Sequence, residues 1–499
     1  MKREPNPEQD AIVEASRSRS TSVSAAALAG TGKTTTMVGV AEANPHASIL
    51  YIAYNRSTKD EAKQRFPRHV RVVTSHGLAY GSIGKDFGRR LNARQPRSRD
   101  AARLMGLPQE TRFAFCTTCD QVADAGCASH AVLVERMEGW RIASLVKRTL
   151  EKFCYSAFEL PRVRHAGRCP QGLDQRVWPQ IAVHVTKLAI RVWKTDLQDP
   201  DGKLWFWPDI YLKMYQLSKP RLPQRVIILD EAQDTNDCVW DIVQSQKGKQ
   251  VILVGDSNQM IYEWRGSKDV MELLEGAVRL SLTGSYRFPQ PIADAANDFL
   301  ELLDVKERLR GLATWEGFAG EVYEGDSSAD CAIYRTNAGC ISGAMAGLEL
   351  GLKVAIVGGG AAIEYLARAA ADLQAGRSTD HPELVGFENW EQVLRFVKEE
   401  PEDAGTLVPI VNAITEYGPQ AILDMTRRLV DEADADFTVT TCHKAKGREW
   451  DHVVIGNDFP QPVPGREPRR EELRLAYVAV TRARKVVELG SLAYGRQGL

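Results

Sequence analysis

Short apolar segments recur in two parts of the chain, and each is followed at once by a turn or by polar residues. The segments of the first part are Thr21–Leu28, Ser48–Tyr54, Val70–Thr74, Val226–Leu229 and Val251–Val254. Those of the second part are Cys331–Tyr334, Lys353–Val357, Thr438–Thr441 and His452–Ile455. Segments of helical periodicity alternate with them, and this alternation is typical of a parallel α/β sheet. We therefore expect an α/β protein with two lobes that bind ligands at the carboxyl ends of their strands.

Two longer stretches interrupt these lobes. The first, at about 81–214, has helical patterning and many Arg and Trp residues. The second, at about 361–435, contains the helix-like segments Tyr365–Leu373 and Trp390–Lys398. We interpret both stretches as inserted helical subdomains. The expected division is a first lobe of 1–80 and 215–290 and a second lobe of 291–360 and 436–499.

The composition is that of a globular protein, because 43% of the 499 residues are hydrophobic and 26% are charged. No apolar run reaches the roughly 18 residues that a membrane span needs, so we expect no membrane partner. The N-terminus becomes polar at once, unlike a secretory signal. Nine cysteines, an odd number scattered through the chain, do not suggest a disulfide framework. These features favour a cytoplasmic protein.

The net charge of -1 shows no global basic field that would attract nucleic acid. A protein that grips one strand in a narrow channel needs only local positive charge. Such charge is present in two clusters, and solvated helix faces explain any single member better than a DNA track does. The clusters are Arg89, Arg90, Arg94, Arg97, Arg99 and Arg103, and Arg141, Lys147, Arg148 and Lys152.

A phosphate-binding loop is indicated where the segment Thr21–Leu28 runs into Ala29–Thr36 and a helical pattern follows. Backbone N–H groups of such a loop surround phosphates, and the following helix points its positive end at them. Lys33 would reach the outer phosphates, and Thr34 would supply a hydroxyl to Mg²⁺. Ala27 stands where the usual pattern has its first Gly. The expected ATP-binding residues of the loop are Gly30, Thr31, Gly32, Lys33, Thr34 and Thr35.

An acidic motif follows the apolar segment Val226–Leu229. Two adjacent carboxylates at a strand end suit phosphoryl transfer, since Asp230 can hold Mg²⁺ with Thr34 and Glu231 can orient and deprotonate the attacking water. Alone, such a pair would be a solvated acidic turn. With a phosphate-binding loop upstream, it predicts ATP hydrolysis.

From this motif on, the chain resembles the superfamily 1 helicases of the UvrD/Rep type, whose motifs occur here in the family's order. The matching segments are Asn6–Gln9, Ala53–Asn55, Thr74–His76, Asp230–Asp234, Val254–Gly266, Ser285–Arg287, Arg335–Asn337, Thr441–Trp450 and Glu471–Ala483. The segments Thr74–Tyr80 and Tyr211–Ser218 are similar to the helicase core of the F-box DNA helicases in particular. The resemblance implies two RecA-like lobes of the P-loop NTPase class, each with an inserted subdomain.

The resemblance also implies roles around ATP. Gln9 would read adenine, Tyr286 would stack on it, and Glu449 would contact the ribose. Gln259 would sense the γ-phosphate. Arg287 and Arg482 would supply positive charge there, a task that arginine performs well. Because Arg482 would come from the second lobe, hydrolysis would depend on lobe closure.

On the DNA side, the resemblance and the aromatic residue types point to stacking of bases on Trp264, with Tyr262 beside it. Core packing is the common alternative for aromatic residues. Asn55, His76 and His443 would contact the DNA backbone or couple it to the ATP site, and Tyr54 and Thr74 are also expected on the DNA side. The family implies translocation from 3′ to 5′.

Cys116, Cys119, Cys127 and His130 place four zinc-ligand types within fifteen residues. Two pairs with two-residue spacings fit a tetrahedral site. The loop between the pairs is short, the surrounding pattern is helical, and the family core does not require zinc. We therefore favour free cysteines in a helical insert over a zinc site.

The motifs predict an ATP-dependent DNA helicase that translocates on single-stranded DNA and unwinds tailed duplex DNA. Its cofactors would be ATP and Mg²⁺, and proteins of DNA replication, repair or recombination would be its partners. A second hypothesis is a DNA-dependent ATPase or regulatory subunit without productive unwinding, because the second insert has only about 75 residues, fewer than in the large family members. A helicase-nuclease is disfavoured, because no segment is left for a nuclease domain.

Overall fold

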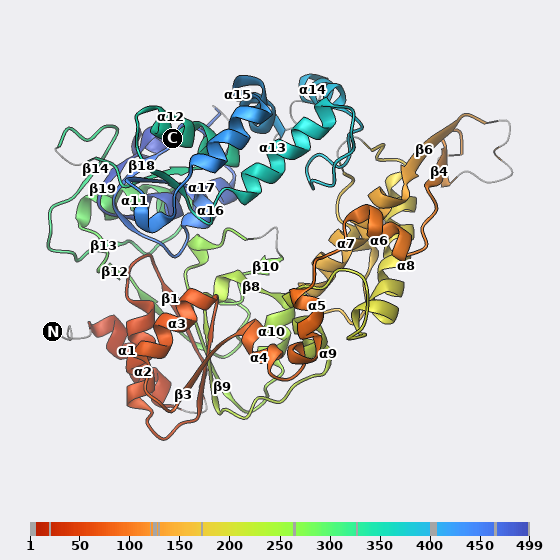
Figure 1. Ribbon diagram of the computed structural model, residues 1–499. Helices are drawn as coiled ribbons and strands as arrows, with labels where there is room; N and C mark the ends of the chain where they lie inside the picture. Colours follow the sequence, from red (N-terminus) through yellow and green to blue (C-terminus); the bar gives the residue numbers. More distant parts are fainter. Residues whose placement is uncertain are drawn as a thin grey trace.

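The computed structural model describes residues 6–18, 21–119, 121–122, 127, 130–170, 173–262, 266–325, 328–399, 407–463 and 467–497. Two lobes face each other, and a third body of mainly helices extends from the first of them (Figure 1). Among the described residues, no helix combines the length and the apolar character needed to cross a membrane.

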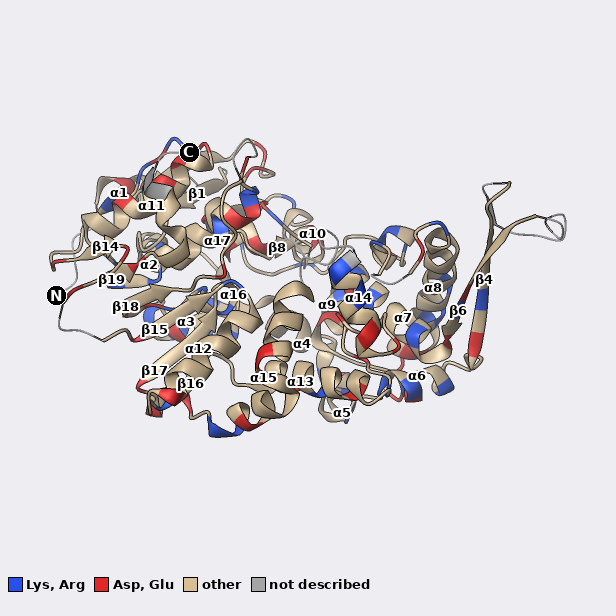
Figure 2. Cartoon of the chain, turned by 90° about the horizontal axis from the view of Figure 1, so that it is seen from above, with Lys and Arg blue, Asp and Glu red and all other residues tan. Residues whose placement is uncertain are grey.

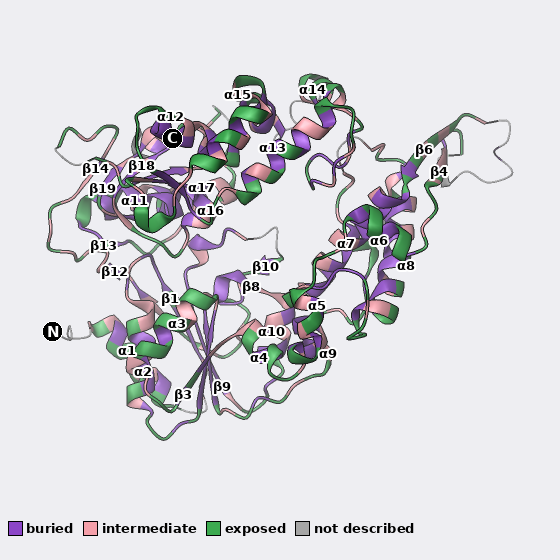
Figure 3. Ribbon diagram, in the orientation of Figure 1, coloured by how far each residue is buried: buried purple, intermediate pink, exposed green. Residues whose placement is uncertain are grey.

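The first lobe contains a six-stranded parallel sheet with the order β11-β1-β9-β7-β2-β3. Its central strands are almost wholly buried, as apolar runs covered on both faces require (Figure 3). The strands are β1 (Val23–Ala27), β2 (Ile49–Ala53), β3 (Val70–Thr74), β7 (Val226–Asp230), β9 (Gln250–Gly255) and β11 (Val278–Leu282). The helices of this lobe are α1 (Pro7–Arg17), α2 (Lys33–Ala43), α3 (Arg56–Arg65), α4 (Ser75–Tyr80), α9 (Pro208–Leu217) and α10 (Asp237–Gln244).

The second lobe contains another six-stranded parallel sheet, with the order β14-β19-β18-β15-β17-β16. The prediction of an α/β protein built on two parallel sheets is thereby confirmed. The strands are β14 (Phe318–Gly320), β15 (Cys331–Tyr334), β16 (Val354–Ile356), β17 (Phe437–Thr441), β18 (Trp450–Ile455) and β19 (Ala483–Glu488). The helices are α11 (Gln290–Leu302), α12 (Asn337–Glu349), α16 (Cys442–Ala445) and α17 (Arg470–Val480).

Two pairs of very short strands lie near the junction of the lobes. They are antiparallel β8 (Thr235–Asn236) with β10 (Ser267–Lys268), and parallel β12 (Gly284–Ser285) with β13 (Arg310–Gly311).

The body between β3 and β7 is not purely helical, which corrects the sequence-based expectation. Its helices are α5 (Gly88–Asn92), α6 (Ser98–Leu104), α7 (Gly139–Cys154) and α8 (Trp178–Val192). A three-stranded antiparallel sheet, in the order β5-β4-β6, projects beyond them (Figures 1 and 2). These strands are β4 (Glu110–Cys116), β5 (Gln121–Val122) and β6 (Val132–Glu138).

Arg90, one of the clustered basic residues, is a structural residue. Its guanidinium is buried and donates to the carbonyl oxygens of Asp196, Asp199 and Leu204 and to the Asp196 carboxylate. Because this guanidinium is buried and bonded within the insert, it stabilises the insert and cannot reach the phosphates of DNA.

The stretch between β16 and β17 is helical, as expected, and consists of α13 (Ala361–Gln374), α14 (Trp390–Glu399) and α15 (Leu407–Arg428). Helix α15 is interrupted at Gly418, whose φ of 74° lies in the left-handed region, directly before Pro419. The two inserts touch, because Arg141 donates to the Gly386 carbonyl oxygen and Arg99 donates to the Ser378 hydroxyl.

Candidate ATP and DNA sites

The loop between β1 and α2 has the shape that its glycines dictate. Gly30 and Gly32 have φ values of 73° and 83°, a region that favours glycine. A Cβ on Gly30 would lie 2.7 Å from Cβ of Arg287, so a larger residue would also collide with the next motif. Gly32 precedes α2 and offers no side chain to cap it. The N–H groups of the first turn of α2 are thus directed toward the loop, where an anion can bind them.

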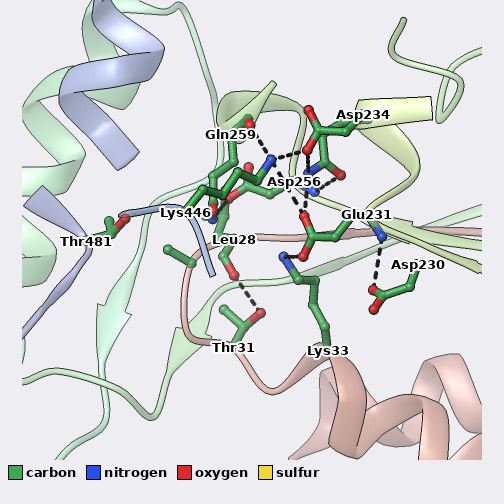
Figure 4. A network of polar contacts seen from close by, with 12 residues as sticks. Leu28, Thr31, Lys33, Asp230, Glu231, Asp234, Asp256, Gln259, Lys446 and Thr481 are labelled. Atoms are coloured by element: carbon green, nitrogen blue, oxygen red, sulfur yellow. Dashed lines mark hydrogen bonds and ion pairs between the residues drawn. The ribbon is translucent and has the colours of Figure 1, made fainter. Parts of the chain in front are cut away.

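Lys33 opens α2 and forms an ion pair with the acidic motif. Its Nζ lies 3.0 Å from Oε1 of Glu231, and both side chains are largely buried (Figure 4). Burial alone would lower the pKa of Lys33, but the carboxylates of Glu231, Asp256 and Asp230 outweigh it and raise the pKa above its usual value. The lysine is therefore held in its charged form beside the loop.

The two acids that end β7 have different surroundings. Asp230 is buried and accepts a hydrogen bond of 2.5 Å from the Tyr51 hydroxyl. Burial and the neighbouring charge of Glu231 raise the pKa of Asp230. Burial also acts to raise the pKa of Glu231, but Lys33 and Lys446 hold it below its usual range. Opposite shifts in one pair are typical of acids with separate tasks.

Glu231 is also held in an uncommon backbone conformation. Its φ of 49° and ψ of 47° place it in the left-handed region, where a non-glycine residue is strained. Nε2 of Gln233 donates to Oε2 of Glu231 over 2.6 Å and fixes the carboxylate. Such strain persists where surrounding contacts enforce it, as they do here.

Residues of the second lobe reach into this site, among them Lys446, Tyr477 and Arg482. Lys446 lies against Asp234 and donates to the Gln259 carbonyl oxygen over 2.6 Å (Figure 4). The Tyr477 hydroxyl accepts a hydrogen bond of 3.0 Å from the Ala29 amide in the phosphate-binding loop. Nη2 of Arg482 lies 3.3 Å from Oε1 of Gln259. The loop and the acidic motif therefore lie at the interface between the lobes.

Both arginines predicted to serve the γ-phosphate are at this interface. Arg482 is buried and donates to the Val478 carbonyl oxygen, and Arg287 donates to the Thr481 carbonyl oxygen over 2.9 Å. Burial and the charge of nearby Arg287 lower the pKa of Arg482 to about 9. Nε of Arg287 also lies 2.7 Å from the carboxylate of Glu449.

The residues expected to meet adenine contact the loop and helix α2. Tyr286 donates its amide to the Gly30 carbonyl oxygen over 2.9 Å, and its hydroxyl accepts a hydrogen bond from Asn6. Gln9 is buried and donates to the Thr36 hydroxyl over 3.2 Å.

The three threonines predicted in the loop have different surroundings. Thr31 is buried and donates to the Leu28 carbonyl oxygen, and Thr34 is half-buried. The Thr35 hydroxyl accepts a hydrogen bond from Arg65.

Several functional candidates escaped sequence reasoning: Tyr51, Asp234, Asp256, Lys446 and Tyr477. All but Tyr51 lie inside segments that match the family's motifs, so the sequence marked their positions but assigned them no role. Tyr51 lies within a buried strand, where an aromatic residue gives no sign of a polar contact.

Residues predicted for DNA lie at the carboxyl ends of β2 and β3. Asn55 caps α3, and Thr74 caps α4 through a hydrogen bond of 3.0 Å from the Gly77 amide. Nε2 of His76 lies 2.9 Å from Oδ1 of Asp209. A cavity of about 310 Å³ is lined by Tyr54, Asn55 and His76 together with Asp230 and Asp234 of the acidic motif.

A second group of predicted DNA residues bridges the lobes. The Tyr262 hydroxyl donates to the His443 carbonyl oxygen over 2.8 Å. The Tyr262 ring is stacked on that of Tyr54, with centroids 6.0 Å apart. Trp264, predicted to stack on bases, lies outside the described residues.

This geometry defines a two-lobed P-loop nucleotide-binding protein whose site is completed across the interface. A family model for the UvrD/REP helicase N-terminal domain matches residues 5–274, and one for the UvrD-like helicase C-terminal domain matches residues 436–489. The first match alone spans more than half of the chain, and the chain therefore belongs to the UvrD/REP helicase family.

Among its relatives is F-box DNA helicase protein 1 of Schizosaccharomyces pombe, with 28% identity over 524 residues that cover 96% of this chain and 56% of that protein. F-box DNA helicase 1 of Gallus gallus is 29% identical over 498 residues, which cover 91% of this chain and 46% of that protein. The ATP-dependent DNA helicase PcrA of Leuconostoc citreum matches over 76 residues with 40% identity, covering 14% of this chain and 10% of that protein. The resemblance drawn from the motifs is confirmed. The chain spans about half the length of the two F-box DNA helicases.

Proposed function

We propose that this protein is an ATP-driven motor that translocates along single-stranded DNA from 3′ to 5′ and unwinds duplex DNA. The proposal rests on contacts that the second lobe makes with the first: Lys446 contacts the acidic motif, Tyr477 contacts the nucleotide loop, and Arg482 contacts Gln259. Separation of the lobes would break these contacts. Nucleotide state and lobe position are thereby linked, as a motor requires.

In this proposal, the nucleotide is held by the loop and by its flanking residues. Backbone N–H groups of the loop and Lys33 bind the phosphates, while Gln9 and Tyr286 hold adenine and Glu449 meets the ribose. Thr34 and Asp230 supply the oxygen ligands that Mg²⁺ prefers, and a divalent cation would offset the cost of burying Asp230. The ion would neutralise charge on the phosphates.

Glu231 is the proposed base for the attacking water, because its carboxylate is held charged and fixed by Gln233. Arg287 and Arg482 would stabilise the charge that develops on the phosphates, and Gln259, bonded to Arg482, would report their state. These tasks require the second lobe to be in place.

The DNA strand is proposed to lie along the carboxyl ends of β2 and β3. Asn55, Thr74, His76 and His443 would contact its backbone, with Tyr54, Tyr262 and Trp264 as stacking platforms. Support comes from the cavity that Tyr54, Asn55 and His76 share with Asp230 and Asp234. A strand that moves these side chains would disturb the acidic motif directly, so we expect DNA to stimulate hydrolysis.

The first test is ATP hydrolysis with and without single-stranded DNA. We expect strong stimulation by the strand, and loss of turnover by at least about 100-fold in Lys33→Ala and Glu231→Gln. Trp264→Ala should keep basal hydrolysis and lose most of the stimulation. Lys353→Ala, at an exposed position before β16, is the matched control and should behave as wild type. Hydrolysis indifferent to DNA would overturn the motor.

Strand displacement on duplexes with a 3′ or a 5′ single-stranded tail then separates the two remaining hypotheses. A helicase of the proposed polarity opens the 3′-tailed duplex and leaves the 5′-tailed one intact. DNA-stimulated hydrolysis without displacement of either would favour the regulatory ATPase, for which the short second insert is the supporting observation.

A further inference from the structure

Four metal-ligand side chains meet at one end of the three-stranded sheet. This sheet projects from the first insert, away from the two lobes (Figure 1). Cys116 is the last residue of β4, the central strand, and it pairs with both β5 and β6. Cys119 lies in the turn that leads to β5, and Cys127 and His130 lie shortly before β6. The structure thus brings together two ligand pairs, whose cysteines we expected to be free in a helical region, at the end of a β-sheet.

The separations of the ligand atoms are those of a tetrahedral metal site. All four atoms lie within 4.8 Å of one another. Nδ1 of His130 lies 3.4 Å from Sγ of Cys116 and 3.1 Å from Sγ of Cys119, and Sγ of Cys119 lies 3.9 Å from Sγ of Cys127. With Zn–S bonds of about 2.3 Å and Zn–N bonds of about 2.0 Å, a tetrahedron places sulfurs about 3.8 Å apart and sulfur about 3.5 Å from nitrogen.

The backbone supports the same conclusion independently. The Cys119 amide donates to Sγ of Cys116 over 3.3 Å, a contact that stabilises a thiolate. The His130 amide donates to the Cys127 carbonyl oxygen over 2.9 Å, and the Thr117 amide donates to that of Ala131 over 3.0 Å. Each ligand pair is therefore positioned by a local turn, and the hydrogen bond between Thr117 and Ala131 connects the two turns.

Near the cluster, the sheet packs against the core of the insert through Phe115 and Leu133, which are only partly buried. Along β6 only Met137 is buried, while Val132 and Val134 are 38% and 36% exposed. A sheet end with this limited apolar packing would gain stability from a structural metal.

We propose that Cys116, Cys119, Cys127 and His130 bind one Zn²⁺ ion that stabilises the end of this sheet. Four protein ligands complete the tetrahedron, so the site is structural and leaves no position for a substrate. The three cysteines would bind as thiolates and His130 through Nδ1. A disulfide explains the cluster less well, because bonded sulfurs lie about 2.05 Å apart, whereas Sγ of Cys119 and Sγ of Cys127 are 3.9 Å apart. A disulfide would also leave one cysteine and the histidine without a role.

The test is metal analysis of the full chain purified without chelator. We expect about one zinc per chain in the wild type, and less than about a tenth of that in the Cys119→Ser/Cys127→Ser variant. Cys169→Ser is the matched control, because Cys169 lies outside the cluster, and it should retain the metal. No zinc in the wild type, a different metal at that stoichiometry, or full zinc in the double variant would overturn the proposal.

Because the double variant can fail to fold, alkylation of wild-type thiols provides a second test. Mapped by peptide mass spectrometry, Cys119 should resist the reagent although its side chain is exposed, and a zinc chelator should release Cys116, Cys119 and Cys127 together. Labelling of Cys119 at equal rates with and without chelator, or a disulfide in the unreduced peptide map, would contradict the site. Neither result depends on ATP hydrolysis, so this inference stands or fails apart from the proposed motor.

Discussion

The hydroxyl of Tyr477, in the second lobe, donates a hydrogen bond of 3.1 Å to Oδ2 of Asp256 in the first lobe. The same hydroxyl accepts from the Ala29 amide over 3.0 Å, and the tyrosine is completely buried. One side chain therefore joins helix α17 to the phosphate-binding loop and to the segment that contains Gln259. This contact ties the nucleotide loop to the position of the other lobe.

Tyr477→Phe keeps the ring and removes both hydrogen bonds. We expect the free energy of unfolding to fall by about 1–2 kcal/mol, because the buried Ala29 amide loses its partner. Under the proposed function, DNA-stimulated turnover should fall more than nucleotide affinity, which fluorescent-nucleotide titration and steady-state kinetics measure. Tyr365→Phe, which removes a tyrosine–aspartate hydrogen bond in the second insert, is the control. Equal losses in both variants would refute a special role for Tyr477.

Lys446 and Asp234 form a buried pair across the lobes, with exposed side-chain fractions of 7% and 0%. Burial raises the pKa of Asp234 to about 6, although Lys446 opposes that shift. Lys446→Met should therefore destabilise the protein by roughly 3–5 kcal/mol, since it leaves a buried acid without its counter-charge. The Lys446→Met/Asp234→Asn double variant should recover much of that loss. Denaturant unfolding of both single variants and the double variant measures the coupling, and strictly additive losses would show that the pair does not interact.

The sequence could place the phosphate-binding loop and the acidic motif in one candidate site, because each follows a strand of the same parallel sheet, β1 and β7. Contacts between motifs were not predictable in the same way. Tyr477 and Asp256 are 221 positions apart, and no local pattern shows that they meet. Only the folded arrangement of the lobes joins them.

Strand prediction failed where a strand is half exposed. In Val278–Leu282, the edge strand β11, Arg279 and Ser281 alternate with apolar residues, so it lacks the continuous apolar run by which the central strands were recognised. The sheet of β4 and β6 was mistaken for helix for the same reason, since few of its side chains are buried. Its few buried positions, among them Phe113 and Met137, are too sparse to show a period of two.

Arg287 of the first lobe and Arg482 of the second should differ from paired arginines outside the nucleotide site in their effect on turnover. Arg482→Lys keeps the positive charge but loses the planar guanidinium that contacts Gln259 and Thr481. Arg287→Lys likewise loses the contacts of the guanidinium with Thr481 and Glu449. We expect each to lower kcat for ATP by about 100-fold or more, with a smaller effect on KM. Arg484→Lys, whose partner is the exposed Asp451, should leave kcat within about twofold of wild type. An unchanged kcat in Arg482→Lys would exclude it from the reaction.

His165 makes the first insert sensitive to acid. The ring is buried between Phe153 and Phe158, and its Nδ1 accepts a hydrogen bond of 2.8 Å from the Arg162 amide. Burial, with the nearby charges of Arg164 and Lys213, lowers the pKa of His165 to about 4. In the unfolded chain the histidine takes up a proton near pH 6.5, so the native state loses stability as the pH falls from about 6.5 toward 4.

Between pH 7 and pH 5 this loss amounts to about 1–2 kcal/mol. His165→Asn places an amide oxygen near the position of Nδ1 and cannot be protonated, so its unfolding midpoint should fall less than that of the wild type over this interval. Thermal unfolding at both pH values measures the difference, with exposed His46→Asn as the control. If His165→Asn and wild type lose the same number of degrees on acidification, the acid sensitivity arises from other buried groups.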